Sequence, residues 1–177
     1  MIISIIGASS INRIAKILGK SEDEINQMLG EVAKIVAESG SGILAVPEGA
    51  QKFFIQKYKE FGGKKAIALI PEDDKKWGFE WLEENICDEK MNCGTWIDLP
   101  YFIMSNCDLV IQMAFGAGTV SELVFLNYPW KDRPKPKVLS IKDFLRNGKL
   151  PEEFGFSKKD IDYVSINELK KKLKELC

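Results

Sequence analysis

Apolar and polar positions alternate in blocks along the chain, with short apolar runs separated by stretches of helical periodicity. The run from Ile2 to Ile6 is rich in β-branched residues and ends at Gly7. This pattern is typical of a parallel strand that is buried on both faces. Further apolar runs, each predicted to form a strand, occupy 42–46, 66–70, 108–113 and 138–140.

Helical patterns fill most of the intervals between these runs. Apolar residues three and four positions apart predict a helix from about Asn12. A second helix is predicted to begin at a capping box formed by Ser21 and Glu24, and to end at Gly40. Further helices are expected at about 49–60, in a short segment ahead of Asp108, at about 120–127, and after a second capping box at Ser165 and Glu168.

The stretch 72–94 is polar and predicts irregular structure, and 94–98 is a candidate strand. Trp77 and Trp81 lie four positions apart in this part of the chain, so they would share one face of a helix. Such a pair could form a base-stacking surface, but paired aromatic residues more often pack in the core or in a dimer interface.

Repeated alternation of strands and helices predicts parallel βαβ units with right-handed crossovers. We therefore expect an α/β fold, with a doubly wound, mainly parallel sheet between two helical layers, as in Rossmann-like proteins. The 177 residues show no internal repeat or boundary and predict a single domain, 1–177. In such a sheet, ligands bind at the carboxyl ends of the strands, near the point where the strand order reverses.

The composition excludes several kinds of chemistry. The chain contains no histidine, so a Ser-His-Asp triad, a Cys-His pair and a histidine-based zinc or haem site are all excluded. Its 25 basic and 26 acidic residues give a net charge of -1, with no electrostatic signature of a nucleic-acid-binding protein. The basic segment 170–174 lies among leucines at helical spacing, as expected for the solvated face of a helix.

The four cysteines show no CxxC pair and no zinc-site spacing, so we expect neither a bound metal nor a resident cofactor. A Cys87–Cys93 disulfide is conceivable only in an oxidising compartment. We expect a cytoplasmic protein with reduced thiols and no membrane association, because the sequence shows no signal peptide and no run of about 20 apolar residues.

Two strand ends carry small or special residues that are candidates for ligand binding. The first is the turn Gly7-Ala8-Ser9-Ser10, which offers a tight bend and two hydroxyl groups. The same residues are equally suited to simple capping of the next helix. The second strand end is Val46-Pro47-Glu48-Gly49, where Glu48 could bind a ribose hydroxyl or act as a second carboxylate. A glutamate that follows proline is also a common way to begin a helix.

The strongest local signal is the segment Gly116-Ala117-Gly118-Thr119, followed by Glu122. Glycines after a buried strand let backbone amides approach a phosphate, and the Thr119 hydroxyl adds a donor. Glu122 would then stand beside the bound phosphate or sugar as a catalytic carboxylate. A capped helix without a ligand explains the same residues equally well.

These motifs resemble the Lonely Guy family, formerly labelled lysine-decarboxylase-like, within the SLOG superfamily. Its hallmark is an Asp-led strand running into Pro-Gly-Gly-x-Gly-Thr-x-x-Glu, which is similar to 108–111 followed by 116–123 here. The order and spacing of strands, glycine turns and helices are similar over about 1–127. The resemblance implies a Rossmann-like fold, usually a homodimer, that binds a nucleotide or a related ligand. Classical members hydrolyse the N-glycosidic bond of cytokinin nucleoside monophosphates.

The chain departs from the family pattern at three places. Leu99 stands where the family has its catalytic arginine, Ala114-Phe115-Gly116 replaces Pro-Gly-Gly, and 46–49 replaces a Gly-Gly-Gly turn. We therefore expect a sensor or carrier that binds a nucleotide or a nucleotide-derived ligand, as a homodimer or higher oligomer. The alternatives are a nucleoside 5'-monophosphate phosphoribohydrolase using Glu122, and a structural or assembly protein.

Overall fold

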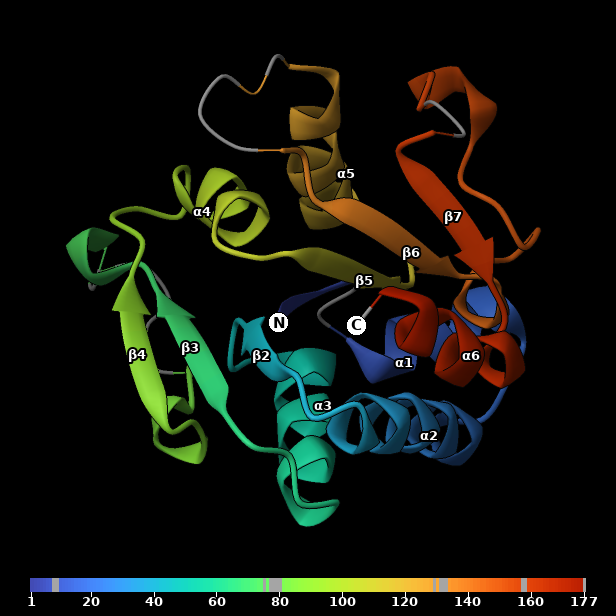
Figure 1. Cartoon of the computed structure of the whole chain (residues 1–177), viewed down its shortest axis with the longest axis horizontal. Coiled ribbons are helices and arrows are strands. Elements are labelled where there is room, and N and C mark those ends of the chain that lie inside the picture. The colour runs from blue at the N-terminus through green and yellow to red at the C-terminus, as the bar shows by residue number, and fades with distance from the viewer. Residues whose placement is uncertain are drawn as a thin grey trace.

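The computed structural model describes residues 1–7, 10–74, 76, 81–128, 130, 134–156 and 159–176. Its centre is one parallel sheet of seven strands (Figure 1). The strands are β1 (Ile2–Gly7), β2 (Gly42–Ala45), β3 (Ala66–Ile70), β4 (Glu89–Asn92), β5 (Leu109–Met113), β6 (Lys137–Ile141) and β7 (Ile161–Val164). Their order across the sheet is β4-β3-β2-β1-β5-β6-β7.

The chain winds outward from β1 to β4, returns to the other side of β1 and continues to β7. The order therefore reverses between β1 and β5, whose register pairs Ile3 with Leu109 and Gly7 with Met113. This is the doubly wound α/β fold that the sequence predicts, and the prediction is confirmed. It also fixes where a crevice opens, at the carboxyl ends of β1 and β5.

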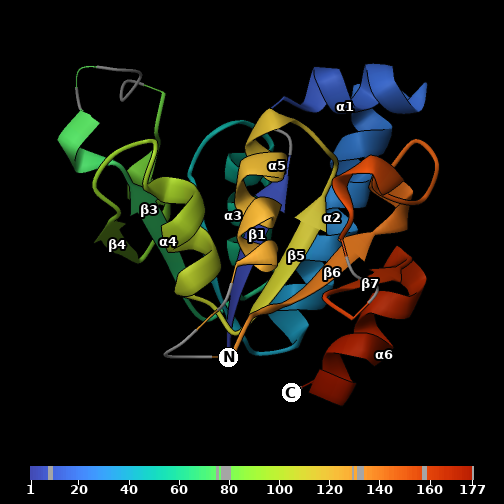
Figure 2. The same ribbon diagram turned by 90° about the horizontal axis from the view of Figure 1, so that it is seen from above.

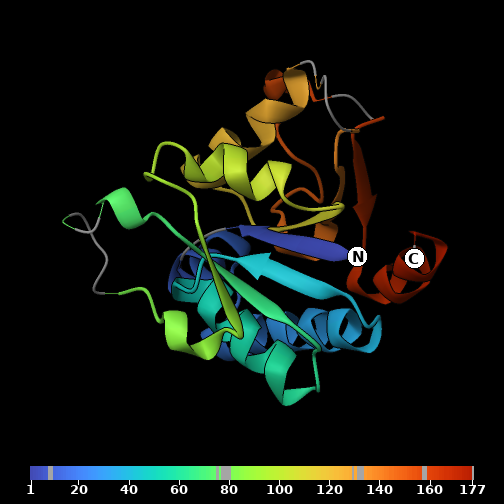
Figure 3. The same cartoon turned by 60° about the vertical axis from the view of Figure 1, so that its left-hand side comes forward.

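Helices cover both faces of the sheet. They are α1 (Ile11–Leu18), α2 (Glu22–Glu38), α3 (Gly49–Glu60), α4 (Leu99–Ser105), α5 (Ala117–Leu123) and α6 (Ile166–Leu176). Helices α1, α2, α3 and α6 pack against one face, and α4 and α5 pack against the other, which gives three layers (Figures 2 and 3).

Each face of the sheet has its own apolar core. Ile3 and Ile5 of β1 contribute to the core beneath α1, α2, α3 and α6, whereas Ile6 contributes to the core beneath α4 and α5. This division follows from the alternation of side chains along a strand. The central strands are buried on both faces, which explains their nearly continuous apolar sequences.

The helix boundaries follow local capping chemistry. Ser10 accepts a hydrogen bond from the backbone amide of Arg13 at 3.3 Å and caps α1, which ends at Gly19 with a left-handed φ of 66°. The predicted capping box at the start of α2 is present, with Ser21 and Glu24 bonding each other's backbone amides. Within the described residues, no helix combines the length and the apolar character needed to cross a bilayer.

Four details differ from the sequence predictions. The segment 94–98 forms turns, and the strand of this region is β4, which lies within the stretch expected to be irregular. Its sequence, Glu-Lys-Met-Asn, is polar because β4 is an exposed edge strand. β7, at the opposite edge, was not predicted, and α5 begins at Ala117 rather than at 120.

Short 3₁₀ turns complete the chain: η1 (Glu72–Asp74), η2 (Glu84–Ile86), η3 (Val124–Asn127), η4 (Lys142–Phe144) and η5 (Glu152–Phe154).

Candidate functional site

A hollow of about 350 Å³ opens at the carboxyl edge of the sheet, where the strand order reverses. Its walls come from the end of β1, the first turn of α1, the β2–α3 connection, the start of α4 and the first turns of α5. The lining residues are Gly7, Arg13, Val46, Glu48, Gln51, Trp96, Leu99, Pro100, Gly116, Ala117, Gly118, Thr119, Ser121 and Glu122. These elements meet at one edge because all the strands run in the same direction, as the arrows for β1 and β5 show in Figure 2.

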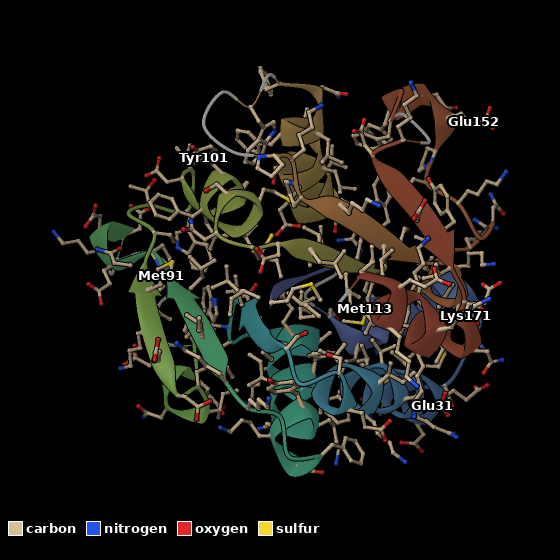
Figure 4. All side chains as sticks on the ribbon, in the orientation of Figure 1. Glu31, Met91, Tyr101, Met113, Glu152 and Lys171 are labelled. Carbon is tan, nitrogen blue, oxygen red and sulfur yellow. The ribbon has the colours of Figure 1, made fainter. Side chains whose placement is uncertain are left out.

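Gly7 lets β1 and β5 end in close contact beneath this hollow. A β-carbon built on Gly7 would lie 1.7 Å from the carbonyl oxygen of Met113, the last residue of β5 and one of the residues labelled in Figure 4. Only glycine can occupy this position without a backbone shift. The first glycine of the predicted turn therefore has a demonstrable steric role.

The backbone after β5 is held in an uncommon conformation. Ala114 has a φ of 63°, in the left-handed region, which costs a non-glycine residue roughly 1–2 kcal/mol. The side chain of Gln112 donates a hydrogen bond to the Ala114 carbonyl and accepts one from the Ser140 hydroxyl. Gln112 and Ser140 are both completely buried, so this pair fixes the strand end from which the Gly116–Thr119 segment leaves.

Two buried polar groups face the hollow without a hydrogen-bond partner among the described residues. They are the hydroxyl oxygen of Thr119 and the Oε2 atom of Glu122, whose residues are 1% and 5% exposed. Burial raises the pKa of Glu122 to about 8, so its carboxyl group is mainly protonated at neutral pH. Unpaired buried polar groups are rare in folded proteins, and a ligand that bonded them would relieve their desolvation cost.

Glu48 brings a second carboxyl group to the same hollow. It occupies the N-cap position of α3 but makes no capping hydrogen bond through its side chain. Burial raises the pKa of Glu48, and a hydrogen bond from the Trp81 side chain partly opposes that rise. Gln51 instead stabilises the start of α3, because its side-chain oxygen accepts from the Val46 amide at 2.9 Å.

Arg13 supplies a cation that the sequence analysis did not identify as a site residue. It lies in the first turn of α1, which directly follows β1, and this position brings it to the hollow. Leu99, at the position where the resembling family has arginine, lines the same hollow and is 7% exposed. The arginine at this site therefore comes from α1 rather than from α4.

The structure brings together most of the residues predicted from the sequence. Those that line the hollow are Gly7, Glu48, Gly116, Ala117, Gly118, Thr119 and Glu122. Ser10 is used to cap α1, Gly49 opens α3 with a φ of 49°, and neither lines the hollow. Ala8 and Ser9 lie outside the described residues, as do Trp77 and Phe79.

Seven lining residues are not among the predicted site residues: Arg13, Val46, Gln51, Trp96, Leu99, Pro100 and Ser121. A useful signal was available for Arg13 and Gln51, since each lies in the first turn of a helix that directly follows a predicted strand. Such a turn faces the carboxyl edge of the sheet. Trp96 and Pro100 had no comparable signal, because the β4–α4 segment was not correctly assigned.

The cysteines do not form a metal centre in the part of the chain that the structure describes, where no cluster of three or more potential ligands is found. Burial raises the pKa of the Cys87 thiol to about 11 and that of Cys93 to about 11. Both groups are therefore thiols rather than thiolates at neutral pH, and thiolate is the form that reacts and binds metals.

Comparison with known proteins identifies a shared fold but no sequence family. No protein-family model matches the chain, and no curated protein matches it in sequence. The molybdenum cofactor carrier protein of Chlamydomonas reinhardtii has a similar structure, with a TM-score of 0.71 at 17% identity over 99% of this chain and 96% of that chain.

Two further solved structures are also similar. One is the molybdenum cofactor binding protein of Rippkaea orientalis, with a TM-score of 0.65 at 16% identity over 99% of this chain and 96% of that chain. The other, a structural genomics target named TM1055, has a TM-score of 0.65 at 15% identity over 98% of both chains. At these low identities the comparisons show a shared fold, and this fold covers nearly the whole chain.

Proposed function

We propose that this chain binds a phosphorylated, nucleotide-like ligand in the hollow at the β1–β5 crevice and acts as its carrier or sensor. The observation that carries the proposal is the pair of buried groups, Thr119 and Glu122, which face the hollow without partners among the described residues. Both groups would gain hydrogen bonds from a ligand, and those bonds would offset the cost of burying the groups unpaired.

The charges around the hollow suit an anionic ligand. Arg13 provides a fixed positive charge, and backbone amides of the Gly116–Thr119 segment add donors for phosphate oxygens. Glu122 repels an anion less than an ionised glutamate would, because its raised pKa keeps it largely neutral at pH 7. A protonated carboxyl group can also donate a hydrogen bond to a ring nitrogen or a carbonyl oxygen of the ligand.

The fold adds a candidate for the cargo. Two proteins of similar fold are a carrier and a binding protein of the molybdenum cofactor, and this supports testing that cofactor as well as nucleotides. The protein would carry the molybdenum cofactor as cargo and would not use it in catalysis. This agrees with a site that offers an anion-binding loop and no cluster of metal-binding side chains among the described residues.

The test combines ligand retention with direct binding. The full chain is isolated from cells that make the molybdenum cofactor, and the purified protein is assayed for molybdenum and for pterin fluorescence. Separately, calorimetric titration measures binding of the cofactor, AMP and ADP-ribose. Thr119→Val and Glu122→Ala should each weaken binding roughly tenfold or more, since each removes a buried ligand contact. The control is Glu175→Ala, an exposed position on α6. Wild-type protein that binds none of these compounds would disprove the proposal.

Phosphoribohydrolase activity is a second candidate, supported by the Glu122 carboxyl group. A carboxylic acid with a pKa near 8 can act as a general acid at neutral pH and protonate a departing base. Arg13, which lines the same hollow, could bind the 5'-phosphate. Release of adenine from AMP that disappears in Glu122→Gln would establish this activity. Release at the same rate in the variant would rule out Glu122 as the acid.

A further inference from the structure

A second hollow, of about 250 Å³, lies beside the first and shares two of its walls. Arg13 lines the first hollow and Ile14, the next residue of α1, lines the second. In the same way, Gly116 lines the first and Phe115 lines the second. Neighbouring α-carbons are about 3.8 Å apart, so the two hollows adjoin along the dividing wall that α1 and the 115–116 segment form.

The second hollow differs from the first in its chemistry. Its lining is mostly apolar and includes Ile14, Ile17 and Leu18 from α1 and Phe115 from the segment after β5. The Phe115 ring is held by an edge contact with Phe154 of η5, at 5.4 Å between centroids. A flat ring system is the ligand group that suits such a surface, because aromatic and aliphatic walls bury its faces without demanding hydrogen bonds.

Charge is arranged so that an anion would be drawn to the dividing wall. Arg146 and Lys149 line the second hollow, where no Asp or Glu is found among its described lining residues. On the other side of the wall stands Arg13, while Glu48 and Glu122 belong only to the first hollow. Cations on both sides of one wall favour a ligand whose phosphates cross it.

The volumes of the two hollows also support a single ligand that occupies both. Small-molecule sites usually enclose roughly 300–1,000 Å³. The second hollow, at about 250 Å³, lies below this range, and the first, at about 350 Å³, lies at its lower end. Together they fall well within the range, which suits a single ligand that occupies both.

We infer that the ligand class of this site is a dinucleotide: two ring systems joined by a diphosphate, with one ring in each hollow and the diphosphate at the wall between Arg13 and the Arg146–Lys149 pair. This inference rests on the proposed function and goes beyond it, since the proposed function requires only the first hollow. The second hollow then determines specificity, because a mononucleotide cannot reach it.

The test compares four probes by calorimetric titration of the full chain: AMP, ADP-ribose, NAD and FAD. ADP-ribose carries the diphosphate without a second ring, so it separates the contribution of the phosphates from that of the ring. We expect NAD or FAD to bind roughly ten- to hundredfold more tightly than AMP, with ADP-ribose in between.

Variants of the second hollow make the test specific. Ile17 is 42% exposed, so Ile17→Glu should fold normally while placing a carboxylate in the apolar hollow. It should weaken NAD or FAD binding roughly tenfold or more and leave AMP binding unchanged. Ile97→Glu, at a position that is 87% exposed and outside both hollows, is the matched control. Arg146→Gln should weaken ADP-ribose, NAD and FAD but spare AMP.

The outcomes separate this inference from the proposed function. If AMP or the molybdenum cofactor binds but no dinucleotide binds more tightly than AMP, the inference is wrong and the proposed function stands. Equal losses for AMP and for the dinucleotides in Ile17→Glu would also overturn it, since they would indicate a general disturbance of α1. If neither the cofactor nor any nucleotide binds, both fail.

Discussion

Ser140 donates a hydrogen bond to the side chain of Gln112 across the β5–β6 strand pair, where the two residues are in direct register. Gln112 in turn donates to the carbonyl of Ala114, which has the left-handed φ of 63°. A buried polar pair in the middle of a sheet thus determines how the chain leaves β5 and enters the candidate site. Its removal should affect stability and ligand binding together.

Replacement of Gln112 by leucine leaves both the Ser140 hydroxyl and the Ala114 carbonyl without this partner. We expect a loss of about 2–6 kcal/mol in the free energy of unfolding, because each of the two unsatisfied buried groups costs about 1–3 kcal/mol. Ser140→Ala should cost less, about 1 kcal/mol. The double variant should lose less stability than the sum of the two single-variant losses, as expected of residues that share a hydrogen bond. Urea unfolding of the four proteins measures this coupling, and strict additivity would contradict it.

Gly7 offers a sharper steric prediction. Gly7→Ala places a β-carbon where the structure has the Met113 carbonyl, at 1.7 Å, so β1 or β5 must shift. We expect a loss of more than about 3 kcal/mol in the free energy of unfolding, or a failure to fold.

The matched control for this substitution is Gly30→Ala, within α2, where a β-carbon would meet nothing within 4 Å. That change should stabilise the protein by about 0.5–1 kcal/mol, because alanine favours the helix more than glycine does. Thermal unfolding of the two variants should therefore shift in opposite directions. A Gly7→Ala protein as stable as the wild type would show that the close approach has no energetic consequence.

Tyr58 joins the loops that lead into β2 and β3. Its buried hydroxyl donates to the Ser41 carbonyl at 2.7 Å and accepts from the Lys65 amide at 3.2 Å. Tyr58→Phe keeps the ring but leaves both backbone groups without that partner, so we expect a loss of about 1–3 kcal/mol in the free energy of unfolding. Ligand binding should be unchanged, since Tyr58 does not line the hollow. Urea unfolding measures the loss of stability, and AMP titration measures ligand binding. A variant that binds AMP more weakly than the wild type, or that is equally stable, would contradict the prediction.

The sequence was most informative where one requirement dominated the choice of residues. The strand at 2–6 is buried on both faces, so it is nearly all apolar and could be predicted from this pattern. β4 and β7 are edge strands with partly exposed side chains, and three of the four residues of β4 are polar, so neither carries the pattern of a buried strand. Exposure at the edge of a sheet removes the signal on which strand prediction depends.

The candidate site follows the same reasoning. The Gly116–Thr119 segment and Glu122 were predictable because glycines after a strand, followed by a glutamate within the next helix, are unusual enough to be noticed. Arg13 was overlooked, since an exposed arginine on an amphipathic helix is ordinary in sequence, and its place in the first turn of the helix after β1 was the one available signal. Only the placement of α1 at the carboxyl edge of the sheet brings it to the hollow. The second hollow depends on the same tertiary placement.

Glu122 should make stability depend on pH in a recognisable direction. Its pKa is about 8 in the folded protein, compared with 4.5 for an ordinary glutamate, so the folded state binds more protons than the unfolded state between these values. Stability should therefore fall as pH rises from about 4.5 to about 8, and level off above. In Glu122→Gln this fall should be reduced, and the variant should be more stable than the wild type at pH 9 by a few kcal/mol.

Urea unfolding at pH 5, 7 and 9 measures the effect, with Glu175→Gln as a control for loss of an exposed carboxylate. The two glutamine variants should diverge at pH 9 and agree more closely at pH 5, where Glu122 is protonated in the folded protein. Parallel pH dependences for the wild type and Glu122→Gln would mean that Glu122 titrates as an exposed acid does. The neutral, hydrogen-bond-donating carboxyl group that the ligand-binding proposal assigns to it would then be absent at neutral pH, and the proposal would rest on Thr119 and Arg13 alone.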